Sequence, residues 1–147
     1  VMSQNQNKLQ LVKIDALQNQ HTNLLELIDK ITAVDISEEN KIYEIIKDIK
    51  RFFNIVKIHN NKEEEFVYNL LLPKLNTTRY KQVSALYLAK NELIQQLISY
   101  KNVFNTEEKI LQNKDRYEEK MVGLLLEWKE HILLENRIVY SLVEEKT

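Results

Sequence analysis

Apolar residues recur along this chain in alternating steps of three and four, which is the spacing of a helix face packed against a core. The pattern predicts four helices separated by three short breaks. The expected inward positions are Ile14, Leu17, His21, Leu24, Ile28 and Ile31; Ile42, Ile45, Ile49, Phe52, Val56, His59, Glu63, Phe66 and Leu70; Val83, Leu86, Lys90, Leu93, Leu97 and Tyr100; and Met121, Leu124, Trp128, His131, Glu135, Ile138 and Leu142.

The breaks between the helices contain residues that end or cap helices. The first helix is expected from about Leu9 to the break at 33–39, where Ser37 is the predicted start of the second. The second helix should stop near Pro73, and Asn76 opens the turn before the third. The remaining chain begins with the cap candidate Thr106 and is predicted to form a fourth helix, interrupted near residues 113–115.

Composition supports an all-α fold. The chain has 147 residues, which is most simply one domain, and only one glycine and one proline. Hairpins and sheets need turn residues, so this scarcity favours few, long helices. We therefore predict a single domain over residues 1–147, an antiparallel up-down-up-down four-helix bundle, with the polar residues 1–8 disordered.

Charge and cysteine content exclude several classes of function. The 21 basic and 22 acidic residues are interspersed, so neither a nucleic-acid-binding face nor a polybasic membrane anchor is expected. No apolar run of membrane-spanning length and no signal-peptide pattern is present, which predicts a cytoplasmic location. The absence of cysteine excludes disulfides, thiolate catalysis and cysteine-bound metal clusters.

Polar residues occupy inward positions where leucine or isoleucine is expected. All three histidines of the chain lie there, and two of them belong to a His-x-x-x-Glu pair: His59 with Glu63, and His131 with Glu135. Residues four apart lie one turn above each other on one helix face, where an imidazole and a carboxylate can hold one metal ion. Burying such groups is costly unless they are paired or bind metal.

Helix register places these groups at one level of the bundle. In an antiparallel pair, the turn lies midway between residues at the same height. The midpoint between His21 and His59 falls near a predicted break, as do the midpoints between Glu63 and Lys90 and between Lys90 and His131. Helical bundles build metal sites from side chains on facing helices in this way. Lys90 stands where a fourth histidine would complete the pattern.

This arrangement resembles the hemerythrin-like family of HHE cation-binding domains over about residues 10–145. The family's continuation after His-x-x-x-Glu ends in Tyr or Phe followed by Pro; Tyr68 and Tyr140 match it, and neither is followed by Pro. The resemblance implies a four-helix bundle with a non-haem di-iron centre. Carried over residue by residue, it implies that the metal ligands are His21, His59, Glu63, His131 and Glu135, with the glutamates bridging two irons.

Lys90 lies on the third predicted helix, where the family has a further histidine ligand. This changes what the site can hold, because a protonated ammonium has no lone pair for a metal. Three outcomes remain open. Two irons bind, with water or a side chain such as Tyr87 filling the gap. One metal binds, held by two histidines and one or two carboxylates. Alternatively no metal binds, and Lys90 neutralises Glu63 and Glu135 in a buried ionic network.

The leading functional hypothesis is therefore a non-haem iron-binding protein that binds or senses O2 or NO, or handles iron. The alternative is a metal-free, degenerate bundle that serves as a structural or protein-interaction module. An oxidoreductase that activates O2 at a di-iron centre is a weaker hypothesis, since no substrate cavity can be argued from the sequence.

Overall fold

The computed structural model describes residues 2–146, and the side chains of residues 12–145 within them. The long helices are α1 (Met2–Thr32), α2 (Ile42–Glu63), α4 (Thr77–Val103) and α7 (Gly123–Leu134). Shorter helical pieces extend or connect them: η1 (Glu39–Lys41), η2 (Glu64–Tyr68), α3 (Asn69–Leu71), η3 (Leu72–Lys74), α5 (Glu107–Gln112), α6 (Lys114–Arg116), η4 (Tyr117–Val122), η5 (Glu135–Tyr140) and α8 (Ser141–Lys146).

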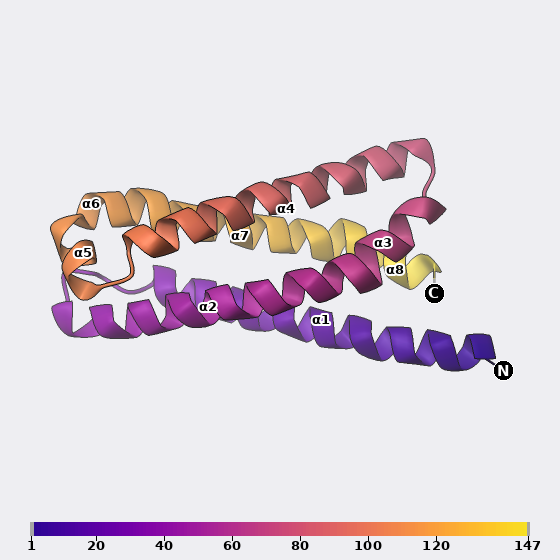
Figure 1. The fold of residues 1–147 in the computed structure, drawn as a ribbon, viewed down its shortest axis with the longest axis horizontal. Coiled ribbons are helices and arrows are strands. Elements are labelled where there is room, and N and C mark those ends of the chain that lie inside the picture. The colour runs from indigo at the N-terminus through magenta and orange to yellow at the C-terminus, as the bar shows by residue number, and fades with distance from the viewer. Residues whose placement is uncertain (1, 147) are drawn as a thin grey trace.

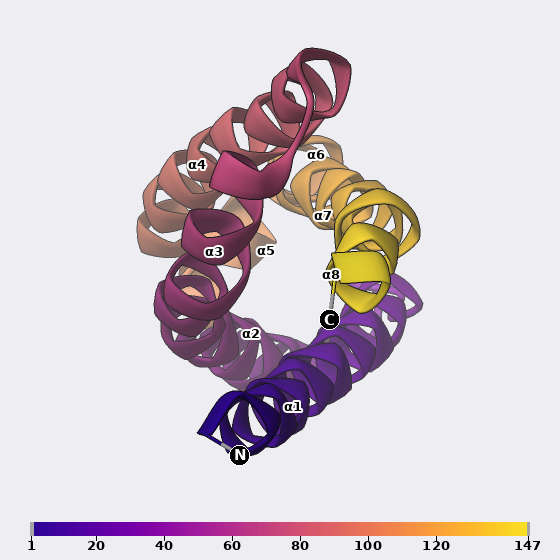
Figure 2. The ribbon, with the colours of Figure 1, turned by 90° about the vertical axis from the view of Figure 1, so that its right-hand side faces the viewer.

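The helices form the predicted all-α, antiparallel bundle. Figure 1 shows α1 and α4 running in one direction and α2 and α7 in the other, with the N- and C-terminal ends of the chain at the same end of the bundle. Viewed along the bundle, α1, α2, α4 and α7 follow one another around a ring (Figure 2), and α1 packs against both α2 and α7. Among residues 2–146 no helix combines the length and the apolar character needed to cross a bilayer.

Two predicted caps are confirmed and one is wrong. Asn76 Oδ1 accepts from the Arg79 N–H at 2.9 Å, and Thr106 Oγ1 accepts from the Lys109 N–H at 3.2 Å. Ser37, however, does not cap α2. Its N–H donates to Asp35 Oδ1 at 2.9 Å in a turn, and α2 begins later, at Ile42. The local Asx turn competes with the cap for the backbone there.

The first helix also begins earlier than predicted. Its backbone is helical from Met2, whereas we expected a start near Leu9 with residues 1–8 disordered. The segment is polar but contains neither glycine nor proline, so nothing in it stops the helix. Val1 lies outside the described residues. The predicted interruption near 113–115 is confirmed, because α5 ends at Gln112 and α6 starts at Lys114.

Both His-x-x-x-Glu helices contain a π-helical turn at or just after the glutamate. The turn η2 follows Glu63, and η5 begins at Glu135. A π turn adds one residue to the helical repeat, which shifts the inward face by one position. The predicted inward residues Phe66, Leu70 and Ile138 are therefore only partly buried or exposed. The buried positions that follow the glutamates are Val67, Tyr68, Leu71, Val139 and Tyr140.

The core consists of two apolar clusters. A layer of buried polar residues separates them. The larger cluster contains Phe52, Met121 and Trp128 and surrounds the end of the bundle at the α1–α2 turn. The smaller cluster contains Leu17, Val83 and Val139. The polar groups lie between these two apolar regions on α1, α2, α4 and α7, so the fold isolates them from water on both sides.

Candidate metal centre

Six ionisable residues form the polar layer, and all are nearly inaccessible to solvent. Each of the six has at most 4% of its surface exposed. The layer contains the five predicted ligands together with the lysine from α4. Its members are His21, His59, Glu63, Lys90, His131 and Glu135.

Glu63 is the most heavily contacted member of the layer. Its Oε2 atom lies 2.8 Å from His59 Nε2 and 3.1 Å from His21 Nε2. Its other oxygen, Oε1, accepts a hydrogen bond from Lys90 Nζ. One carboxylate thus faces two imidazoles with one oxygen and an ammonium group with the other.

Glu135 is held more loosely. Its Oε1 atom lies 3.5 Å from both His21 Nε2 and His131 Nε2, and its Oε2 atom lies 3.9 Å from Lys90 Nζ. These separations are ion-pair contacts rather than well-formed hydrogen bonds. His21 therefore lies between the two carboxylates, and Lys90 sits much closer to Glu63 than to Glu135.

The two tyrosines that follow the glutamates cross between the sequence repeats. Tyr140 donates to Glu63 Oε2 at 2.6 Å, and Tyr68 donates to Glu135 Oε2 at 2.5 Å. Each tyrosine lies five residues after a glutamate, a position that a regular α-helix would turn away from it. The π turns η2 and η5 bring the hydroxyls into the layer, so both tyrosines bind polar-layer carboxylates as well as filling the core.

Two amide side chains orient the histidines from behind. The Nδ1 atom of His59 lies 2.8 Å from Gln20 Oε1, and that of His21 lies 2.6 Å from Asn136 Oδ1. An amide oxygen only accepts, so both Nδ1 atoms carry hydrogen and both Nε2 atoms point at Glu63. Outer partners of this kind fix the tautomer and ring orientation of metal-binding histidines.

The charges in the layer shift one another's ionisation. Burial alone would raise the pKa of Glu63, but the Lys90 charge and hydrogen bonds from His21 and His59 hold it well below its usual range. Burial and the charge of Glu63 both raise the pKa of Glu135. Contacts with His131, His21 and Lys90 outweigh them, so the pKa of Glu135 is lowered. Both glutamates are therefore ionised at neutral pH.

His21 responds in the opposite direction. Burial would lower its pKa, but the contacts with Glu135 and Glu63 outweigh burial and raise that pKa to about 10. Burial also raises the pKa of Tyr68 and that of Tyr140, next to the carboxylates that they contact, so both hydroxyls stay protonated. Without a metal, protonated His21 and the Lys90 ammonium supply positive charge beside the two glutamates.

Tyr87 does not fill the position of the missing histidine. Its hydroxyl donates to Glu64 Oε1 at 2.8 Å, at the edge of the layer, and its ring packs on that of Tyr68. The position is filled instead by Lys90 itself, whose Nζ lies 4.6 Å from the centre of the Tyr68 ring. We therefore discard Tyr87 as a substitute ligand.

Three of the donors form one compact group. The ligand atoms of His21, His59 and Glu63 all lie within 4.8 Å of one another, and all three residues are buried. Two imidazoles and one carboxylate are the set typical of non-haem iron with open positions. The grouping does not include His131 and Glu135, and His131 Nε2 is buried without a hydrogen-bond partner among the described residues.

Comparison with known proteins gives one family. The family model described as the hemerythrin HHE cation binding domain matches residues 12–143, which include the whole polar layer. A curated relative, ATP synthase subunit delta of Clostridium botulinum (strain 657 / Type Ba4), is 28% identical over 127 residues, or 84% of this chain and 68% of that protein. An identity at this level does not place the chain in that relative's family. No solved structure matches the chain.

Proposed function

The chain belongs to the hemerythrin HHE cation-binding family, and from that premise we propose that it binds one non-haem iron ion at His21, His59 and Glu63. The observation that carries the proposal is the convergence of these three donors inside a layer closed to water. His131 and Glu135 complete the layer as neighbours of the ion. O2 or NO is the small ligand that we propose for the open positions.

Lys90 supports one ion rather than two. Its ammonium contacts Glu63 and faces Glu135 in the half of the layer where the family places a further histidine. A fixed positive charge there repels a second cation and supplies part of the charge that a second cation would bring. The lysine therefore makes the second half of the site a permanent, metal-free counterpart of the first.

The chain's own residues determine what bound iron does. Iron with open positions supplies a place for a small diatomic ligand to coordinate. Gln20 and Asn136 hold the two imidazoles with Nε2 turned toward Glu63, and the apolar clusters exclude water from both sides. Tyr68, Tyr140 and Lys90 provide hydrogen-bond donors and positive charge at the carboxylates. We propose reversible binding or sensing of that ligand as the use of the site.

Metal analysis after anaerobic loading with Fe(II) tests the proposal. We expect about one iron per chain in the parent, because three donors converge at one point, and about two in the Lys90→His variant. His59→Gln is the matched control and should lose iron without unfolding. Iron at background level in the parent, with no rise in melting temperature on adding Fe(II), would contradict iron binding. An unchanged stoichiometry in Lys90→His would show that Lys90 does not occupy a second metal position.

A metal-free interaction module is the second candidate, and the Lys90–Glu63 contact favours it. Protonated His21 and Lys90 place positive charge beside the two glutamates, which offsets part of the cost of burying those carboxylates without a metal. The loading experiment separates the candidates. A parent that binds no metal, yet has the thermal stability of a folded bundle, supports this second function.

A further inference from the structure

A pocket of about 270 Å³ lies between α4 and α7, and its chemistry differs from that of the other hollows on the bundle. Glu92 from α4 and Glu127 and Glu130 from α7 line it, together with Gln96 and apolar residues of both helices. All three carboxylates are solvent-exposed, and none forms an ion pair with any residue in the described part of the chain. No lysine or arginine is among the residues that line it.

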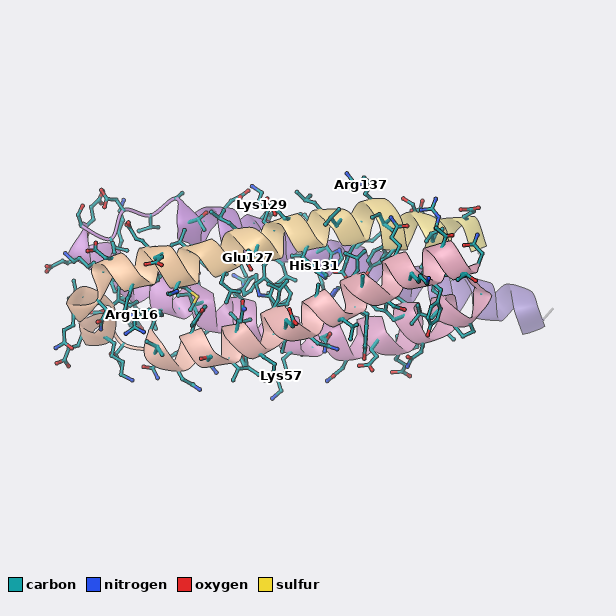
Figure 3. All side chains as sticks on the ribbon, turned by 90° about the horizontal axis from the view of Figure 1, so that it is seen from above. Lys57, Arg116, Glu127, Lys129, His131 and Arg137 are labelled. Carbon is teal, nitrogen blue, oxygen red and sulfur yellow. The ribbon has the colours of Figure 1, made fainter. Side chains whose placement is uncertain are left out.

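His131 forms the inner wall of this pocket. Only 4% of its surface is exposed, and it lines the pocket. Among the described residues its Nε2 has no hydrogen-bond partner, and its ion-pair contact is with Glu135 at 3.5 Å. Figure 3 shows Glu127 and His131 on the side of α7 that faces α4, one turn apart, while Lys129 of α7 and Arg137 of η5 project from the opposite side. Lys129 is engaged there with Asp29 of α1 at 2.8 Å. Lys129 and Arg137 thus lie away from the pocket.

From His131 a continuous series of metal-binding atoms leads to the proposed iron ligands. His131 Nε2 lies 3.5 Å from Glu135 Oε1, and that oxygen lies 3.5 Å from His21 Nε2. His21 Nε2 in turn lies 3.1 Å from Glu63 Oε2, which contacts His59. Nitrogen and carboxylate atoms thus follow one another at ion-pair distance from His131 to the proposed ligands, and His21 must release its Nε2 proton before it can take the ion.

The hollow between α1 and the α2–η2 region gives a contrast. It is lined by Lys13 and Lys62 with a single glutamate, Glu65, and it reaches Gln20 rather than a metal-binding atom. Its lining charge repels a divalent cation, whereas that of the α4–α7 pocket attracts one. Clefts that carry one sign of charge raise the association rate of ions of the opposite sign.

We propose that the α4–α7 pocket is the route by which a divalent metal ion reaches the polar layer, with Glu92, Glu127 and Glu130 attracting the ion and His131 receiving it. This inference rests on the proposed function, since it concerns the loading of that same site. It assigns His131 a role as a transfer ligand at the boundary of the layer. It also accounts for the Nε2 atom, which contacts Glu135 at 3.5 Å without a hydrogen bond among the described residues that a cation would have to break.

Stopped-flow loading of the full chain with Co(II), followed by its visible absorption, tests the charge of the route. Removing the three carboxylates together (Glu92→Gln, Glu127→Gln and Glu130→Gln) should slow association by about tenfold at low ionic strength and leave the final stoichiometry unchanged. The difference should shrink in high salt, where surface charges are screened. A matched variant with Glu26→Gln, Glu44→Gln and Glu118→Gln carries the same net charge and should load at the parental rate.

A second pair of variants tests the path itself. Ala89 and Ala16 are both exposed alanines, one in the α4–α7 pocket and one in the α1–η2 hollow. Ala89→Phe should slow both association and dissociation of Co(II) at every salt concentration, and Ala16→Phe should change neither. Parental rates in the triple-glutamine variant, or slowing by Ala16→Phe instead of Ala89→Phe, would overturn the route while leaving metal binding intact. A parent that takes up no Co(II) would overturn the proposed function and the route together.

Discussion

The two halves of the polar layer carry the same His-x-x-x-Glu pattern but satisfy their carboxylates very differently. Glu63 has hydrogen bonds to His21, His59, Tyr140 and Lys90, with donor atoms within 3.1 Å. Glu135 accepts one hydrogen bond from a described side chain, that of Tyr68, and its other polar contacts lie at 3.5 Å or beyond. Sequence symmetry therefore does not give equal sites, because the single lysine contacts Glu63 closely and lies 3.9 Å from Glu135.

The largest expected effect comes from removing each glutamate's charge. Glu63→Gln leaves Lys90 buried without its counter-ion, and we expect a loss of roughly 3–5 kcal/mol in the free energy of unfolding. Glu135→Gln should cost clearly less, since Lys90 is 3.9 Å from that carboxylate and keeps its contact with Glu63. Urea unfolding of both variants measures the difference. Equal losses would show that the two halves share the lysine equally.

The pH dependence of the metal-free protein should be next in size. Lowered pKa values of Glu63 and Glu135 contribute stability that is present above about pH 4.5 and lost as the pH falls below it. The raised pKa of His21 contributes stability that is fully present below pH 6.5 and lost as the pH rises through about 10. Unfolding free energy in the presence of a chelator should therefore be greatest between pH 4.5 and 6.5.

The alkaline loss belongs to His21 and can be isolated. His21→Gln should be less stable than the parent at pH 6 and should show a flatter decline toward pH 10. Metal affinity should follow the opposite trend and rise with pH, because His21 must lose its Nε2 proton before it can bind a cation. A parental profile that stays level from pH 6.5 to 10 would contradict the protonation of His21.

The two tyrosine variants should differ in stability by less than the two glutamate variants. Their order is reversed, because the larger loss is expected for the tyrosine that contacts Glu135. A hydrogen bond to a charged group contributes about 1.5–3 kcal/mol. Tyr68→Phe should lie at the upper end of that range, because it removes the hydrogen bond that Glu135 accepts from a described side chain. Tyr140→Phe should lie at the lower end, since Glu63 retains three other donors. Thermal unfolding of the two variants ranks them, and a larger loss for Tyr140→Phe would refute the ranking.

Substitution of the two amide side chains that contact the histidines should have the smallest effect on stability. It should also lower the affinity for metal. Gln20→Ala and Asn136→Ala free the Nδ1 atoms of His59 and His21 and should weaken metal affinity about 10–100-fold. The exposed neighbour Asn19 provides the control, and Asn19→Ala should leave affinity unchanged. Competition with a coloured chelator measures all three. Unchanged affinity in both amide variants would mean that the histidines are oriented without them.

The sequence predicted the bundle, the break near Asn113 and the position of Lys90, because each depends on helical periodicity and on local stop signals. It did not predict the inward face beyond the glutamates, where Phe66 and Leu70 were expected. A π turn depends on tertiary packing, and the 3.6-residue spacing of apolar positions does not reveal it. A tyrosine nine residues after His59 and another nine residues after His131 were the available signal, but only the π turn explains why this spacing matters.

The outer partners of the histidines were missed for a related reason. Gln20 and Asn136 lie beside His21 and Glu135 in the sequence, off the apolar face, where amides are ordinarily solvated. Their adjacency to layer residues was the signal that could have identified them. Ser37 was wrong as a cap, because spacing does not determine local turn geometry. Tyr87 was one candidate to fill the gap beside Lys90, and its hydroxyl contacts Glu64 instead, since spacing does not determine the direction of a hydroxyl.

Lys90 gives Glu63 a counter-ion that is part of the polypeptide. A chelator can strip an ion from a site, and oxidation can alter its charge, but neither acts on an ammonium tethered to a helix. Many small metalloproteins unfold once their metal is withdrawn, because binding and folding share one free energy. This bundle carries its own permanent counter-ion to Glu63. Through a period of metal starvation it should stay folded and ready to be reloaded.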